Sequence, residues 1–177
     1  MSQSKSWCRA VTAALLALAT ATPGNAIAMA SPGSESLRVA LSSQAGTAVR
    51  RALLSARRRL GKESCQAVLT DFTSAEGRSL AAVLRDLGRS PEAHLDTLLF
   101  RDGSTRPRCA SQSILAFTHV GGDTVYVCAS QFHRVAERNP AAADLVLIHE
   151  ALHTLGLGEN PPTSGEIHAR VALRCGT

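Results

Sequence analysis

The chain has 177 residues, a formal net charge of +5 and an aromatic content of only 3%. Five arginines cluster in one helical stretch: Arg50, Arg51, Arg57, Arg58 and Arg59. Proteins that bind single-stranded nucleic acids use aromatic stacking as well as charge, and this chain has few aromatic residues and no nucleic-acid motif, so we expect no nucleic-acid partner. We interpret the arginines as a solvated basic helix face. The alternative is that they bind anionic polymers.

Residues 1–28 have the pattern of a secretory signal peptide. Basic residues flank an apolar run over 10–21, and the small residues at 26–28 offer a cleavage site after Ala28. The run is too short to cross a bilayer and no later stretch is long enough, so we expect no membrane span. The remaining residues, 29–177, are the size of one domain. We therefore expect a single-domain protein that is secreted or periplasmic.

Helical and extended patterns alternate along the first half of this domain. Alanine, leucine and arginine over 37–60 predict one long helix, which a short apolar segment at 67–69 follows. A second helix is predicted near 79–87, before a glycine. The stretch 92–100 stays open, because its leucines fit helical spacing whereas 98–100 has the composition of a strand.

The second half contains a hairpin and then helices. Residues 113–119 and 124–128 are β-prone and flank a Gly-Gly turn, which is typical of two antiparallel strands. Three helices are expected after it, over 131–138, 140–156 and 164–174. These elements predict an α+β fold, a single small domain of several helices with a small antiparallel sheet.

Four cysteines remain once the leader, which contains Cys8, is removed. An even number in an exported protein predicts two disulfides, and three pairings are possible. We favour Cys65–Cys109 and Cys128–Cys175, because the second would tie the last helix to the strand before helix 140–156. A cysteine zinc site is the weaker alternative, since no C-x-x-C pair is present.

The segment 149–159 contains a metal-binding pattern. His149 and His153 are four residues apart, so on a helix they face the same way and can share one Zn²⁺. Glu150 follows the first histidine directly and is placed beside the metal as a base. Asn139 can cap this helix, and Gly156 or Gly158 can end it.

A catalytic zinc usually takes a third protein ligand. Glu159 ranks first, because the glycines at 156 and 158 can turn the chain back toward the ion. Glu166 ranks second, since the sequence Thr163-Ser164-Gly165-Glu166 also matches a capping box for the last helix. His168 ranks third.

The pattern His-Glu-x-x-His-x-x-Gly-x-x-Glu over 149–159 resembles the H-E-x-x-H zinc metallopeptidases, the zincins, with metzincin-like spacing but no Met-turn, since no methionine follows Met29. The resemblance implies a zincin-like domain in which His149, His153 and Glu159 hold Zn²⁺ and Glu150 is the general base. It also implies an edge strand that lines the cleft and pairs with extended substrate, for which residues 124–127 are the candidate.

We therefore expect an exported zinc metallopeptidase that hydrolyses peptide bonds of a peptide or protein substrate through zinc-activated water, with His168 available as a second oxyanion donor. The alternative is a non-catalytic secreted domain, stabilised by zinc or descended from a peptidase, that acts as a binding module. A structural site would be closed by four protein ligands, including both Glu159 and His168. His94, His119 and His133 lack ligand spacing and are assigned to the core or the surface.

Overall fold

The structure of the chain, a computed structural model, describes residues 37–41 and 43–176. The predicted signal peptide at 1–28 lies outside the described residues. In chain order the elements are β1 (Val39–Ala40), α1 (Ser43–Leu60), α2 (Glu63–Gln66), α3 (Val68–Asp71), α4 (Leu80–Asp86), α5 (Pro91–Thr97), β2 (Leu99–Asp102), the 3-10 helix η1 (Pro107–Ala110), β3 (Ala116–Thr118), β4 (Thr124–Val127), α6 (Ala129–Arg138), α7 (Pro140–Thr154) and α8 (Ser164–Cys175).

Helix α7, which carries the histidine motif, is the central element of the fold. The Asn139 side chain accepts a hydrogen bond from the Ala142 N–H at 3.2 Å, and Pro140 occupies the first turn, so the helix starts where the sequence predicts. Gly156 at φ +97° lies just beyond its end. Helix α7 packs on α1, α6, α8 and β3 and is buried along almost its whole length, which explains its apolar composition.

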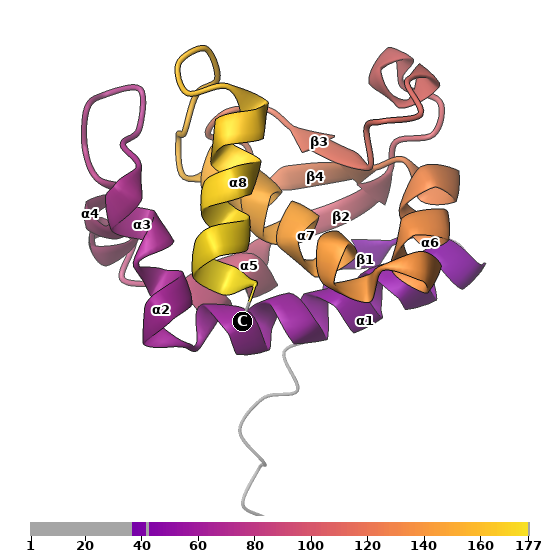
Figure 1. Ribbon diagram of the computed structural model, residues 1–177, viewed down its shortest axis with the longest axis horizontal. Coiled ribbons are helices and arrows are strands. Elements are labelled where there is room, and N and C mark those ends of the chain that lie inside the picture. The colour runs from indigo at the N-terminus through magenta and orange to yellow at the C-terminus, as the bar shows by residue number, and fades with distance from the viewer. Residues whose placement is uncertain (1–36, 42, 177) are drawn as a thin grey trace, which may run out of the picture. The chain divides into compact units, whose positions relative to one another are not determined.

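The sheet is mixed, and this corrects the prediction of an antiparallel one. Its order is β1-β2-β4-β3, in which β1, β2 and β4 run parallel and only β3 runs antiparallel, to β4. The hairpin of β3 and β4 is confirmed. In Figure 1 the hairpin lies toward the top of the view and α1 runs along the bottom.

The assignment of residues 124–127 to the sheet edge was wrong. Strand β4 lies inside the sheet, because β2 pairs with it on one side (Phe100 opposite Val125) and β3 pairs with it on the other. The edge strand beside α7 is β3. The predicted pair of strands is correct. Pairing with β2 decides that β4 is the inner strand and β3 the edge strand, and β2 comes from a distant part of the chain.

Two further segments refine the predictions for the first half. The long helix expected at 37–60 begins only at Ser43, because Val39 and Ala40 form a short strand beside Phe100 and Arg101. The open stretch 92–100 contains both alternatives, the helix α5 and then the strand β2. In each place, pairing with another strand decides the conformation.

Two disulfides are present, as expected, but the favoured pairing was wrong. The bonds join Cys65 to Cys175 and Cys109 to Cys128. The first ties α2 to the end of α8, which pack together, and the second ties η1 to the residue after β4. Disulfides of this kind persist in an oxidising environment.

The arginine cluster of α1 is more than a solvated face. Arg59 donates hydrogen bonds to the carboxylate of Asp144 on α7 at 3.2 Å and to the backbone oxygen of Cys175 at 2.6 Å. Arg57 lies 3.4 Å from the buried carboxylate of Asp96. These two arginines therefore join α1 to α5, α7 and α8.

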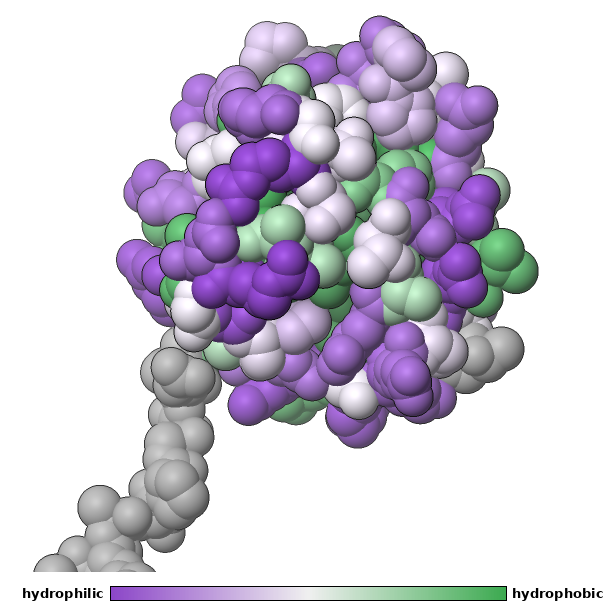
Figure 2. Space-filling view, turned by 90° about the vertical axis from the view of Figure 1, so that its left-hand side faces the viewer, coloured by the Kyte–Doolittle hydropathy of each residue, from purple (hydrophilic) through white to green (hydrophobic). Residues whose placement is uncertain are grey.

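A membrane span requires a long and predominantly apolar helix. None of the helices described is long and apolar enough to cross a membrane. Figure 2 shows the side of the molecule that carries α2, α3 and α4, where hydrophilic side chains cover most of the surface and hydrophobic residues show between them.

Candidate metal centre

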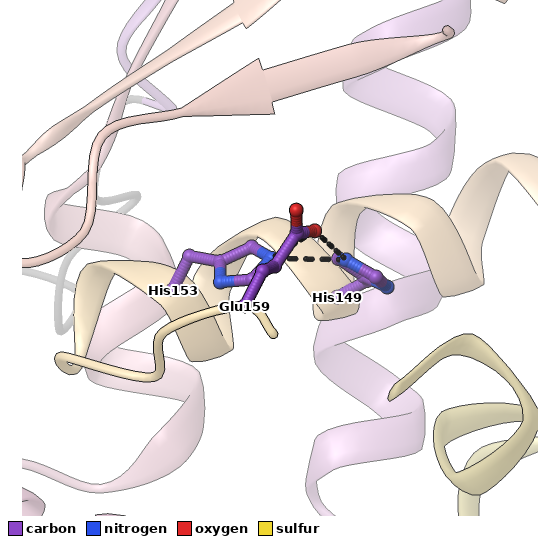
Figure 3. Close-up of side chains that lie close together, drawn as sticks. All are labelled: His149, His153 and Glu159. Carbon is purple, nitrogen blue, oxygen red and sulfur yellow. Dashed lines mark hydrogen bonds and ion pairs between the residues drawn. The ribbon is translucent and has the colours of Figure 1, made fainter. Parts of the chain in front are cut away.

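Three potential metal ligands converge at the end of α7 (Figure 3). The Nε2 atoms of His149 and His153 lie 3.0 Å apart, and both side chains are buried. The Glu159 Oε1 atom lies 3.4 Å from the Nε2 of His153 and 4.0 Å from that of His149. All three ligand atoms lie within 4.8 Å of one another, and about a third of the Glu159 side chain is exposed.

These residues fit a zinc ion. Zn²⁺ binds histidine nitrogen at about 2.0–2.1 Å in a tetrahedral arrangement, which puts neighbouring ligand atoms about 3.3 Å apart. The distances of 3.0, 3.4 and 4.0 Å among His149, His153 and Glu159 are close to that value. A side chain from each of three sequence positions then leaves a coordination position open, as catalytic zinc requires.

The turn after α7 orients the imidazole of His153. Gly156 lets the chain reverse, and the Leu157 carbonyl then lies 2.7 Å from the Nδ1 of His153. A proton on Nδ1 donates to this carbonyl and leaves the Nε2 lone pair free for a metal. The same turn brings Glu159 toward the histidines, so Gly156 helps to position both His153 and Glu159.

The imidazole of His149 is kept neutral by its buried surroundings. Burial lowers the pKa of His149 to about 3, and the charges of His153 and His168 act in the same direction. A histidine must be unprotonated to bind a metal. His149 therefore meets that condition throughout the neutral range.

Glu150 lies beside the ligands without being one of them. Its side chain is buried, and burial raises its pKa to about 8, with the charge of Glu159 as a further cause; Arg108 and a hydrogen bond from the backbone of Thr118 act in the opposite direction. Thr118 belongs to the edge strand β3, so Glu150 lies between the metal ligands and the sheet. A carboxyl with a pKa near neutrality can both accept and return a proton.

The ligands open into a cleft of about 600 Å³. Helix α7 contributes His149, Glu150 and His153 to it, β3 and its neighbours form one wall, and the segment after the glycine turn forms the other. The lining residues are Arg108, Ile114, Ala116, Phe117, Thr118, Val120, His149, Glu150, His153, Glu159, Asn160 and Ser164. The volume of the cleft lies within the range of about 300–1,000 Å³ that is common for ligand pockets.

The two lower-ranked ligands do not join the group. Glu166 is exposed and forms the predicted capping box, in which its Oε2 accepts from the Thr163 backbone N–H at 2.7 Å. These hydrogen bonds lower the pKa of the Glu166 carboxyl. His168 is exposed and its ring centroid lies 6.3 Å from that of His149. Glu159 is thus the candidate that the fold brings to the histidines, and zinc binding stays a prediction.

His94 and His119 have the core and surface positions expected of them. His94 is buried in α5, with its Nε2 2.7 Å from the Thr154 Oγ1 at the end of α7. Burial lowers its pKa to about 4, and the charge of Arg89 adds to the effect. His119 is exposed, and its ring lies in an edge-to-face arrangement with the Tyr126 ring, with the ring centroids 6.5 Å apart.

Sequence reasoning missed two residues of the cleft. Arg108 and Thr118 lie far from the motif along the chain, and no local pattern marks either of them. Their positions depend on the Cys109–Cys128 disulfide and on the order of the strands. The one local signal was the predicted hairpin, which contains Thr118 but could not place it beside Glu150.

Comparison of the chain with protein families, with curated protein sequences and with solved structures finds no match. We therefore infer the class of protein from the α+β fold and from the side chains of the cleft. The resemblance to zincins rests on the eleven residues of the motif.

Proposed function

We propose that this protein is an exported zinc metallopeptidase. The observation that carries the proposal is the convergence of His149, His153 and Glu159 beside the buried carboxyl of Glu150, in an open cleft next to an edge strand. When bound, zinc supplies a Lewis acid that polarises a carbonyl and makes water a nucleophile near neutral pH. The two disulfides and the signal-peptide pattern support export.

The protein groups divide the work of hydrolysis. Glu150 takes a proton from the attacking water and returns it to the amine of the cleaved peptide bond, which a raised pKa favours. The backbone of Thr118 holds the Glu150 carboxyl by a hydrogen bond, and the Leu157 carbonyl fixes the orientation of the His153 ring.

The substrate backbone extends the sheet in this proposal. Strand β3 pairs only with β4 within the described sheet, and the Thr118 backbone holds the Glu150 carboxyl, so the part of its other edge that Thr118 does not use is open to hydrogen-bond an extended peptide. This edge borders the cleft through Ala116, Phe117 and Thr118. A bound peptide would therefore pass directly over the side chain of Glu150.

A second candidate is a non-catalytic binding module with a structural zinc. The observation in its favour is the closeness of His168 to His149, with ring centroids 6.3 Å apart, since a side-chain movement would add a fourth ligand. A site closed in this way would leave no position for water.

The decisive experiment combines zinc content with hydrolysis. The mature protein should bind about one zinc per chain, and His149→Ala with His153→Ala should abolish it. Glu150→Gln should keep zinc and lose about 10²–10⁴-fold in the rate of cleavage of a peptide library. Glu137→Gln, at an exposed position of α6, is the matched control and should cleave like the parent.

The outcomes test the metal site, the mechanism and the choice between the two candidates in turn. Zinc retained by the double histidine variant would remove the site assignment. Equal cleavage by the Glu150→Gln variant and the parent would remove the mechanism. A parent that binds zinc but cleaves nothing, and that loses zinc on His168→Ala, would establish the structural site instead.

A further inference from the structure

Arg108 lies in the cleft at a position that the proposed hydrolysis does not use. It belongs to η1 and lines the cleft together with Glu150 and Phe117. Its guanidinium carbon lies 5.6 Å from the centroid of the Phe117 ring, over the face of that ring. Arg108 makes none of the ion pairs found among the described residues, although its charge acts on the Glu150 carboxyl of the same cleft and lowers the pKa of that group. It is also the only lysine or arginine among the residues described as lining the cleft.

The backbone that carries Arg108 is held in place at the next residue. Cys109 is buried, is bonded to Cys128 after β4, and accepts a hydrogen bond at 2.7 Å from the buried side chain of Gln131 on α6. The Arg108 side chain itself is exposed. A charged group on a fixed backbone loses less conformational freedom on binding than one on a mobile loop, which favours recognition.

The contact with Phe117 relates Arg108 to one position of a bound peptide. Phe117 is the central residue of the edge strand β3. Side chains directly opposite each other on neighbouring strands point to the same face of a sheet. In a peptide paired with the free edge of β3, the side chain opposite Phe117 would therefore lie on the face that Arg108 covers.

We infer that Arg108 is a specificity-determining residue that selects peptides with a carboxylate near the position opposite Phe117, so that the substrate class is acidic peptides. The inference rests on the proposed peptide-binding cleft. The planar guanidinium matches a carboxylate with two parallel hydrogen bonds. Glutamate suits the site best, because its methylene groups can contact the Phe117 ring while its carboxylate reaches Arg108. A free C-terminal carboxylate offers the same chemistry.

The test measures binding separately from cleavage. A fluorescent peptide is made with glutamate, glutamine or lysine at one central position, and each version carries a C-terminal acid or amide. Binding to the Glu150→Gln protein is followed by anisotropy, with zinc and without it. The glutamate peptide should bind about 2–5-fold more tightly than the glutamine peptide, as for an accessible pair of opposite charges. Arg108→Gln should remove this ratio, and Arg108→Glu should make the lysine peptide the tightest.

Arg106→Glu is the matched control. Arg106 is also exposed and also lies over an aromatic ring, 4.7 Å from the centroid of Tyr126, but it does not line the cleft. The preference for glutamate should therefore survive in this variant. If Arg106→Glu and Arg108→Glu reduced the preference equally, general surface charge would explain it and the inference would be overturned.

The remaining outcomes distinguish the inference from the proposed function. A preference that follows the C-terminal acid and disappears in Arg108→Gln assigns the carboxylate to the peptide end. Peptides that do not bind, or that bind with equal affinity whatever their charge, overturn the inference. A parent enzyme that cleaves all versions at equal rates keeps the peptidase function and overturns the inference. A charge preference in binding without any cleavage keeps the inference and removes the peptidase function.

Discussion

Glu159 and Glu166 provide the sharpest test of the metal centre. Glu159 lies 3.4 Å from the His153 Nε2, whereas Glu166 is exposed and bonds to Thr163 in the capping box. Both are accessible acidic side chains close to the cleft. Replacing each by alanine therefore removes the same chemical group, but from a metal site in one case and from a helix start in the other.

The two substitutions should change different quantities, the zinc affinity in one case and the free energy of unfolding in the other. Loss of a carboxylate from outside the ligand shell of zinc typically costs 10–100-fold in affinity, so loss of the ligand Glu159 should cost at least about 100-fold, or about 2.8 kcal/mol. Glu159→Ala should hardly change the stability of the metal-free protein, since that side chain contacts solvent. Glu166→Ala should leave zinc affinity unchanged and lower the free energy of unfolding by about 1 kcal/mol.

Thermal unfolding with and without zinc measures both quantities. Zinc at about 100 times its dissociation constant stabilises the parent by about 2.7 kcal/mol, and this gain should fall to about 0.4 kcal/mol or less in Glu159→Ala. Glu166→Ala should keep the gain and show a melting temperature about 2–4 °C lower in both states. If Glu166→Ala lost the zinc effect and Glu159→Ala kept it, the third ligand would come from α8 and the assignment made here would be refuted.

Two further predictions concern stability. Burial lowers the pKa of His94 to about 4, so the folded state resists protonation, and the contribution of this group is complete above its usual pKa of about 6.5 and is lost as the pH falls toward about 4. The shifted pKa values of His149 and Glu150 also change the stability over this range, so the contribution of His94 is measured as the difference between parent and variant. Between pH 7 and pH 5 the parent should lose about 2 kcal/mol more stability in urea unfolding than His94→Gln. An unchanged pH dependence in that variant would refute the assignment. Replacing Cys65 and Cys175 by alanine should cost about 1.5 kcal/mol more than replacing Cys109 and Cys128, because the first disulfide closes a loop of 110 residues and the second one of 19. Equal losses would show that loop entropy does not govern these bonds.

Local features of the sequence predicted the site helix and its surroundings. The cap at Asn139, the turn at Gly156 and the capping box at Thr163 each depend on residues within four positions of one another, and all three are present. The hairpin before α6 was predicted for the same reason. The convergence of His149, His153 and Glu159 could be expected because one helix and one short turn contain all three.

Features that depend on distant segments could not be obtained in this way. Strand β4 has the composition of an edge strand as much as of an inner one, and only its pairing with β2 places it inside the sheet. The four cysteines allow three pairings, and the packing of α2 against α8 selects one of them.

The sequence by itself thus determined the α+β character, the helix that carries the histidines and the residues that could hold a metal, because short-range hydrogen bonds and helical spacing fix all of these. The tertiary structure alone decided that β3 borders the cleft, that Glu150 lies beside Thr118 of β3 and that Arg108 lines the same cleft. These positions result from contacts between residues far apart along the chain, and such contacts depend on how all the elements pack together rather than on the residues of any one of them.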